Sequence, residues 1–163
     1  HEIVYLDTIL PPLTHGMYTP FGSRAALHST ALGKVLLAFC ADSEIEALLA
    51  QYQFQRFTKN TIDSNEELWK EISEIRQQGF ALDREESSPN IECLASIVVN
   101  QTGYPEAAVS VSSSVCPDEK STITRFSELV CSACHDASRA IGGSLGTDPK
   151  LWFTEVMRKR KLK

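Results

Sequence analysis

The spacing of apolar residues changes period along this chain, and that change limits the folds it can adopt. Residues 29–40, 42–52 and 64–78 place apolar side chains at three- and four-residue steps, which is typical of amphipathic helices. Residues 92–100 and 105–114 read instead as two strands joined across the turn sequence QTGY. A long helical segment, residues 118–143, follows. Helices and hairpin strands within 163 residues predict one α+β domain, with helices packed on a largely antiparallel sheet.

Local signals set the expected limits of these elements. Further extended segments are expected at residues 1–9, 17–28 and 80–84. Helix starts and stops follow from residues that cap backbone groups. The expected caps are Ser29 or Thr30 for the first helix, a capping box of Ser43 and Glu46 for the second, and Ser64 with Glu67, ending at Gly79, for the third.

Composition and charge exclude several classes of function. The net charge is -5, whereas a module that neutralises DNA phosphates is usually basic, so this chain is a poor candidate for touching DNA itself. No apolar run reaches the roughly 18 residues of a membrane span. The five cysteines are odd in number and scattered, which favours reduced thiols in a cytoplasmic protein. The chain starts without Met and enters a strand directly, so we expect an N-terminal portion to be missing.

The sequence CSACH at 131–135 has the spacing that attaches a c-type haem. Its context predicts otherwise, because these residues lie in the middle of a long packing helix. At about 100° per residue, Cys134 borders the expected buried stripe, Cys131 lies further round and His135 faces nearly opposite. The expected stripe comprises Phe126, Val130, Ala133, Ala137 and Ile141. We therefore predict ordinary helix residues here, with no haem and no metal.

A more specific signal lies at residues 24–39, RAALHSTALGKVLLAF. This segment resembles the pattern PLH-[AS]-[TS]-A-x-GK-[AV]-LLA of the effector-binding domain of IclR-type transcription regulators. Residues 57–86 resemble that family's segment from an FT-x-NTI motif to an acidic DxEE, and residues 91–113 resemble its Cys-containing strand, turn and Ser-x-Ser strand. With the long last helix, the resemblance covers roughly residues 1–145.

The resemblance implies a GAF-like α+β fold for residues 1–145. It does not explain the tail, so residues 146–163 are expected to be an added extension. It also implies an upstream winged helix-turn-helix that binds operator DNA and lies outside this chain. Carried over position by position, it implies an effector site made of Ala31, Leu32, Asp83, Ile91, Cys93, Ser110 and Ser112. The chain departs from the family at Asn90, where Gly is usual, and at Ser112–Ser114, where the family often has SVSGP. Asn tolerates left-handed backbone angles, so the first turn is expected to persist.

The residues themselves suggest the chemistry of such a site. The N–H groups of Ala31 and Leu32, at a helix start, have no intrahelical partner and could hold a carboxylate, although a plain cap is the simpler interpretation. Ser110 and Ser112 share one face of a strand, either lining a cavity or facing solvent. Asp83 could accept a ligand hydroxyl or could instead be tied to backbone N–H groups of the following loop. This combination suits a small hydroxy- or keto-acid, such as a sugar acid or an aromatic-acid catabolite.

Two other classes of function remain as alternatives. A small enzyme could use Cys93 or Ser110 as nucleophile with His28 as base, but the sequence shows no oriented third group, and we expect no enzyme. An oligomerisation module without a ligand is the other alternative. The family resemblance implies dimers that pair into tetramers. Independently, Trp152, Phe153 and Val156 form an apolar stripe in the tail, which favours an oligomer unless the tail folds back on its own domain.

Overall fold

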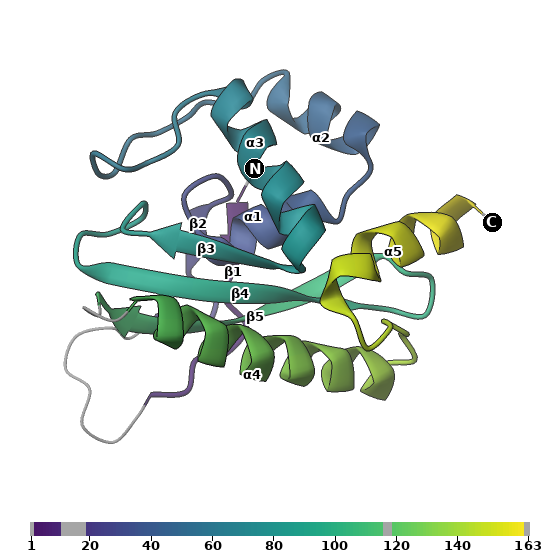
Figure 1. Cartoon of the computed structure of the whole chain (residues 1–163). Coiled ribbons are helices and arrows are strands. Elements are labelled where there is room, and N and C mark those ends of the chain that lie inside the picture. Colours follow the sequence, from purple (N-terminus) through teal and green to yellow (C-terminus); the bar gives the residue numbers. More distant parts are fainter. Residues whose placement is uncertain (1, 11–18, 116–118, 162–163) are drawn as a thin grey trace.

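The computed structural model describes residues 2–10, 19–115 and 119–161 (Figure 1). Within them, strands and helices alternate broadly as the periodicity predicts. The elements are β1 (Glu2–Val4), β2 (Arg24–Ala26), α1 (Ala31–Ala38), α2 (Asp42–Leu49), α3 (Asn65–Gln78), β3 (Phe80–Arg84), β4 (Ile91–Val99), β5 (Pro105–Ser114), α4 (Glu119–Ala140), the short 3₁₀ helix η1 (Pro149–Leu151) and α5 (Trp152–Lys161). None of the helices in the described ranges is long and apolar enough to cross a membrane.

The strands form two antiparallel sheets. The larger has the order β3-β4-β5, and β4 and β5 make the hairpin predicted across QTGY. The smaller pairs β1 with β2 over three residues only, so the first two extended segments are shorter strands than expected. A strand lasts only as long as its backbone groups have a partner, and the turn at Gly22, which has a φ of 82°, ends the pairing. The α+β class is confirmed.

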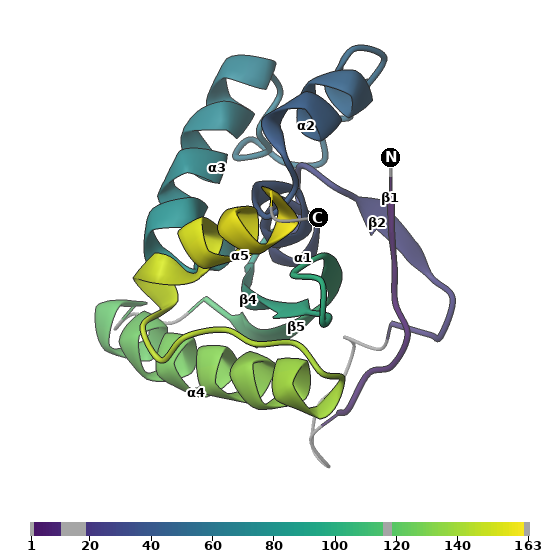
Figure 2. The ribbon, with the colours of Figure 1, turned by 90° about the vertical axis from the view of Figure 1, so that its right-hand side faces the viewer.

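Helices cover both faces of the larger sheet. The helix α4 lies along one face, while α1 and α3 lie on the other (Figures 1 and 2). Along β4, Ala95, Ile97 and Val99 enter the main core with α1 and α3, whereas Leu94 and Val98 pack toward α4. This alternation follows from the two-residue period of a strand, and it explains why residues 94–99 are continuously buried.

The caps agree with the sequence at α1 and α3 but not at α2. Thr30 caps α1, its hydroxyl accepting a hydrogen bond from the N–H of Gly33. Ser64 caps α3, and Gly79 ends that helix in the left-handed region. The predicted box of Ser43 and Glu46 is wrong, because α2 begins earlier. Its cap is Ala41, whose N–H donates to the carboxylate of Glu44 at 2.7 Å, so the reciprocal side-chain contact comes from the third helical position.

The buried face of α4 is rotated from the expected stripe. Its buried side chains are Val130, Cys131, Cys134 and Ser138, whereas Ala133 and Ile141 are exposed. Polar contacts with β4 determine this orientation: Ser138 Oγ accepts the N–H of Val99 at 3.0 Å, and Cys131 Sγ lies 3.6 Å from Ser96 Oγ. Both thiols therefore point into the protein, and burial raises the pKa of Cys134 to about 12. Among the described residues no cluster of three or more His, Cys, Asp or Glu side chains could hold a metal ion.

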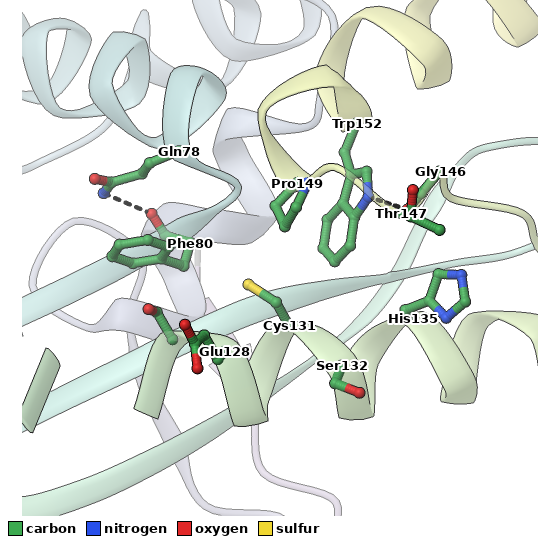
Figure 3. Close-up of a pocket in the computed structure, with 11 residues that line it drawn as sticks. Gln78, Phe80, Glu128, Cys131, Ser132, His135, Gly146, Thr147, Pro149 and Trp152 are labelled. Atoms are coloured by element: carbon green, nitrogen blue, oxygen red, sulfur yellow. Dashed lines mark hydrogen bonds between the residues drawn. The ribbon is translucent and has the colours of Figure 1, made fainter. Parts of the chain in front are cut away.

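The tail folds back onto its own domain. Trp152 is 1% exposed and Val156 0% exposed, and both belong to the main core. The indole N–H of Trp152 donates to the carbonyl of Gly146 at 2.7 Å (Figure 3). Arg160 pairs with Glu44 at 2.8 Å, which ties α5 to α2. Folding back was the second of the two alternatives for the tail, and its apolar stripe therefore gives no support for an oligomer.

Replacing Trp152 tests whether the tail is part of the domain core. We expect Trp152→Ala to lower the free energy of unfolding by about 3–5 kcal/mol, because it removes a fully buried indole and its hydrogen bond. Leu151→Ala, at a neighbouring exposed position, should change it by less than about 0.5 kcal/mol. Urea unfolding of both variants measures the difference. Equal, small effects would mean that α5 does not stabilise the domain.

Candidate effector site

The register of the larger sheet brings three of the expected site residues into one row. Asp83 on β3 lies opposite Cys93 on β4, and Cys93 lies opposite Ser112 on β5. Directly opposed residues in antiparallel strands share a face, so these three side chains are neighbours. Ser112 Oγ donates a hydrogen bond to Cys93 Sγ at 3.1 Å, so two of the three side chains are in direct contact.

The remaining strand residues of the expected site lie on the same face. Ser110, two residues before Ser112, is opposite Ala95 in the adjacent row, and Ile91 precedes Cys93 by two residues. This is the face covered by α1, since Ala95 packs into the core with that helix. Ser110 is half-buried and Ser112 is exposed, so the serine face is neither fully enclosed nor fully solvent-facing.

The N-terminus of α1 supplies the other two expected residues. Thr30 uses its hydroxyl twice, donating to Ala26 O at 2.9 Å and accepting from Gly33 N at 3.1 Å. Among the described residues, no hydrogen-bond partner is present for the N–H groups of Ala31 and Leu32. Two free N–H groups at a helix start carry partial positive charge and suit an anion.

Close packing places this helix start against the preceding segment. A Cβ atom on Gly33 would lie 2.3 Å from the carbonyl oxygen of Leu27, so a larger residue could not occupy this position without moving α1. Glycine is therefore required at position 33 for steric reasons, because α1 packs closely against the backbone of Leu27, just after β2.

Asp83 is hydrogen-bonded to the loop that follows β3. Its Oδ1 accepts the N–H groups of Glu86 at 2.7 Å and Ser87 at 3.3 Å, and its Oδ2 accepts the hydroxyl of Ser87 at 2.6 Å. These are the contacts expected if Asp83 shapes the loop. Burial raises the pKa of Asp83, while the hydrogen bonds and the charge of Lys34 act in the opposite direction. Oδ2 keeps one lone pair that a ligand hydroxyl could use.

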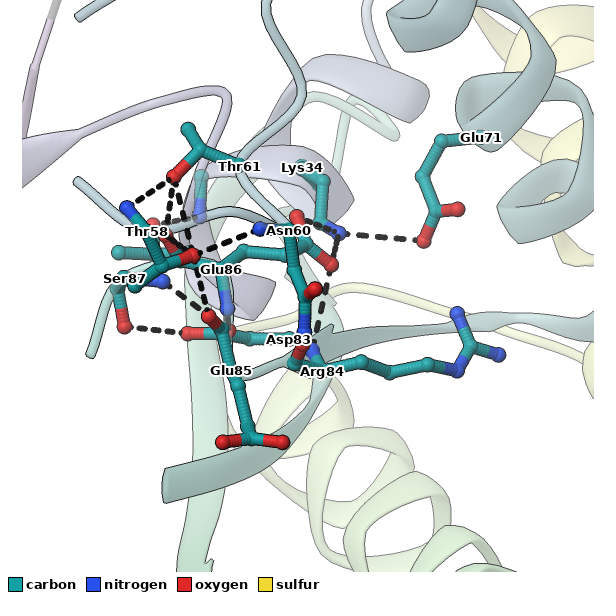
Figure 4. Close-up of polar contacts among 12 residues, drawn as sticks. Lys34, Thr58, Asn60, Thr61, Glu71, Asp83, Arg84, Glu85, Glu86 and Ser87 are labelled. Atoms are coloured by element: carbon teal, nitrogen blue, oxygen red, sulfur yellow. Dashed lines mark hydrogen bonds and ion pairs between the residues drawn. The ribbon is translucent and has the colours of Figure 1, made fainter. Parts of the chain in front are cut away.

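Lys34 on α1 also contacts the loop that follows β3 (Figure 4). Its side chain is 0% exposed, and Nζ lies 2.6 Å from both carboxylate oxygens of Glu86 and 3.2 Å from Glu71 on α3. Three elements, α1, α3 and the loop, thus meet at one buried ammonium group. Sequence reasoning missed this residue, although a single Lys inside the apolar run ALGKVLLA was a usable signal, because a buried charge needs a partner.

The FT-x-NTI segment holds the loop from its other side. Thr58, Asn60 and Thr61 each donate a side-chain hydrogen bond to a backbone carbonyl within residues 84–86, at 2.7, 3.1 and 2.7 Å (Figure 4). At the end of the loop Asn90 has a φ of 62°, so it adopts the left-handed conformation expected of a glycine substitute. The sequence segments that carry the family resemblance therefore lie together around the loop that follows β3.

Two further ring-bearing residues, Tyr5 and His28, lie near the expected site. Sequence reasoning did not assign Tyr5 to the site. Burial, followed by the nearby Cys93 and Asp83, raises the pKa of its phenol. The sequence placed Tyr5 on one strand face with Ile3, which was an available signal. His28 is buried, with Nδ1 2.7 Å from Tyr52 Oη and Nε2 2.9 Å from Gln55 O.

This geometry argues against catalysis by Cys93. Because a carbonyl can only accept, His28 Nε2 must donate to Gln55, and its Nδ1 then accepts from Tyr52. Both ring nitrogens are thus occupied, and neither can act as a base for the thiol. Burial raises the pKa of Cys93 to about 11, whereas a nucleophilic thiol requires a lowered value.

Small polar side chains lie beside an unpaired helix start, on a sheet with helices on both faces, an arrangement that suits the binding of a small ligand. Comparison with known proteins identifies the family. Residues 1–139 match the family model described as "Bacterial transcriptional regulator IclR C-terminal". The chain belongs to this family.

Individual relatives agree with this membership. The chain is 36% identical over 141 residues to the HTH-type transcriptional regulator XynR of Escherichia coli strain K12, covering 86% of this chain and 56% of XynR. The crystal structure of the Thermotoga maritima IclR is similar with a TM-score of 0.82 and 31% identity, over 86% of this chain and 57% of that one. A double mutant of the PobR inducer-binding domain from Acinetobacter, in complex with 3-hydroxybenzoic acid, shares the fold at a TM-score of 0.74 and 24% identity, over 85% and 82% of the two chains. The chain spans about half the length of the curated relatives it matches.

Substitution of Lys34 tests the importance of the buried ion pair. We expect Lys34→Met to lower the free energy of unfolding by about 3–5 kcal/mol, because it leaves Glu86 and Glu71 without their counter-charge. Adding Glu86→Gln should recover part of the loss. Lys70→Met, at an exposed pair with Glu66, should leave stability nearly unchanged. If Lys34→Met and Lys70→Met unfold at the same urea concentration, the ion pair does not hold the loop.

Alkylation of Cys93 tests its raised pKa of about 11. The rate with iodoacetamide should rise about tenfold per pH unit from pH 7 to 9.5 without levelling off, because the thiolate fraction grows throughout this range. N-acetylcysteine in the same buffers should begin to level off near its ordinary pKa. Peptide mapping by mass spectrometry resolves Cys93 from the other thiols. A plateau below pH 8 would restore Cys93 as a candidate nucleophile.

Proposed function

We propose that this chain is the small-molecule-sensing domain of a bacterial transcription regulator and that its effector is a small hydroxy- or keto-acid. The observation that carries the proposal is the pair of free N–H groups, on Ala31 and Leu32, at the start of α1. They would receive the effector carboxylate, with the helix dipole adding a favourable charge. Lys34, one turn later, also exerts a favourable electrostatic effect on ionised Asp83 and Cys93, which supports their closeness to this helix.

The sheet face would hold the rest of the effector. Ser110 and Ser112 offer hydroxyl groups, Ile91 and Cys93 offer apolar and thiol surface, and the remaining lone pair of Asp83 Oδ2 offers an acceptor. A molecule with a carboxylate at one end and hydroxyl or keto oxygens at the other matches this arrangement. The PobR inducer-binding domain supports an acid as the ligand class, because its structure contains 3-hydroxybenzoic acid.

In the whole regulator, effector binding would alter operator binding by a winged helix-turn-helix domain upstream of residue 1. The net charge of -5 supports assigning DNA contact to another domain. We further propose that residues 1–145 form the sensing unit with 146–163 as an extension, that the regulator acts in the cytoplasm, and that it works as a dimer or tetramer. The rival function is an oligomerisation module that binds no ligand.

A thermal-shift panel tests ligand binding directly. Pyruvate, lactate, gluconate and 3-hydroxybenzoate represent keto-, hydroxy-, sugar and aromatic acids, and 3-hydroxybenzamide is a matched control without the carboxylate. At least one acid should raise the melting temperature with saturation, while the neutral amide should not. No shift with any acid, together with a stable oligomer in light scattering, would favour the oligomerisation module.

Variants then test the face that binds. With the acid that shifts the melting temperature, Ser110→Ala should weaken binding about threefold to tenfold, because a neutral hydrogen bond is lost. Ser113→Ala, the same change on the opposite face of β5, should not. Asp83→Ala should lower the melting temperature markedly even without ligand, since three loop hydrogen bonds are lost. If Ser113→Ala weakens binding as much as Ser110→Ala, the effector does not lie on this face.

A further inference from the structure

A cavity lies away from the candidate effector site, at the edge of the larger sheet. It has a volume of about 400 Å³ and opens between α4, the start of β3 and the segment 146–152 (Figure 3). It shares no lining residue with the candidate effector site. Its volume falls within the range of small-molecule pockets, which is about 300–1,000 Å³.

The inner walls of this cavity are apolar and aromatic. Phe80, Pro149 and Trp152 line it from above, and the thiol of Cys131 points toward them from α4 (Figure 3). The indole N–H of Trp152 is already bonded to Gly146, and Gln78 Nε2 donates to the carbonyl of Phe80 at 2.9 Å. These groups are satisfied within the protein, so the walls offer a ring-shaped ligand mainly contact surface.

The two ionisable polar groups considered for ligand binding, Glu128 and His135, both lie on α4. Glu128 and His135 are seven residues apart, which places them about 10 Å apart along the helix. Glu128 is exposed, and no hydrogen bond or ion pair within the described part of the chain engages its carboxylate. His135 Nδ1 lies 3.2 Å from Asp136, which leaves Nε2 available.

The charge of the lining selects the class of ligand. Among the described residues that line the cavity none is Lys or Arg, and Glu128 carries the one full charge. An organic acid placed here would meet a like charge and no counter-charge, whereas an ammonium group would find the free carboxylate. The cavity is therefore unsuited to the acids proposed for the other site.

We propose that this cavity is a second binding site and that it takes a small aromatic amine. The ring packs against Phe80, Pro149 and Trp152, and the ammonium group pairs with Glu128. A polar substituent at the far end of the molecule can reach His135. The site joins α4 to the extension that begins at 146, so the ligand would bridge the two segments.

Trp152 provides the probe for this site. In a Trp69→Phe background it is the single tryptophan, and Phe keeps an aromatic ring beside the Arg76 guanidinium, which lies 5.7 Å from the Trp69 ring centroid. Phenethylamine should change Trp152 emission with saturation below about 20 mM, whereas 3-phenylpropionate, which has a carboxylate instead, should not. Glu128→Gln should weaken phenethylamine binding by about threefold to fivefold, the contribution of an ion pair with an exposed carboxylate. Glu46→Gln, the same change on α2 and outside the cavity, should have no effect.

Three outcomes would overturn the proposal. They are an absence of saturable change with phenethylamine, equal binding of the amine and the acid, and equal affinity of the Glu128→Gln and Glu46→Gln variants. The result is independent of the proposed effector, because the acid panel uses different ligands and a different set of residues. A protein that fails the acid panel can still bind phenethylamine, and the reverse also holds.

Discussion

The buried ammonium group of Lys34 is the constraint on which the candidate site depends. An unpaired charge inside a protein costs several kcal/mol, so α1 can pack on the sheet only where carboxylates reach Lys34. Glu86 and Glu71 satisfy that condition at 2.6 and 3.2 Å. Because Glu86 belongs to the loop after β3 and Glu71 to α3, one ion-pair cluster determines how three segments distant in sequence are arranged.

A second polar anchor holds the other end of α1. Arg76 on α3 donates to the carbonyls of Ala38 at 2.8 Å and Cys40 at 3.1 Å, which satisfies groups left open at the helix C-terminus. The ring of Phe153, from α5, lies 4.1 Å from that guanidinium and covers it. With Lys34 near one end and Arg76 at the other, α1 has little freedom to move. A fixed helix start would lower the ordering cost of binding the carboxylate that we propose for this site.

The two proposed sites have opposite electrostatic character. At the candidate effector site the start of α1 contributes partial positive charge, while Asp83 and Glu86 are engaged by loop N–H groups and by Lys34. The described lining of the cavity beside Trp152 has no cationic side chain and includes the carboxylate of Glu128. A domain with both sites could distinguish acids from amines through separate surfaces of one sheet. The electrostatic difference between the two sites arises because α1 covers the sheet at the candidate effector site, whereas α4 lines the cavity.

Local chemistry determined much of the secondary structure from the sequence alone. The α3 helix could be predicted almost to the residue, because Ser64 caps its start and Gly79 is suited to the left-handed turn at its end. The hairpin of β4 and β5 was also predictable from local sequence, because the turn sequence QTGY separates two strand-like segments. The positive φ of Asn90 was predictable because Asn tolerates left-handed backbone angles. Only the tertiary structure decided which face of α4 is buried, since Ser138 and Cys131 bond to β4 rather than following apolar periodicity. It also decided that Lys34 is buried, that Asp83 binds its own loop and that the tail joins the core, because each depends on partners that folding brings together from distant parts of the chain.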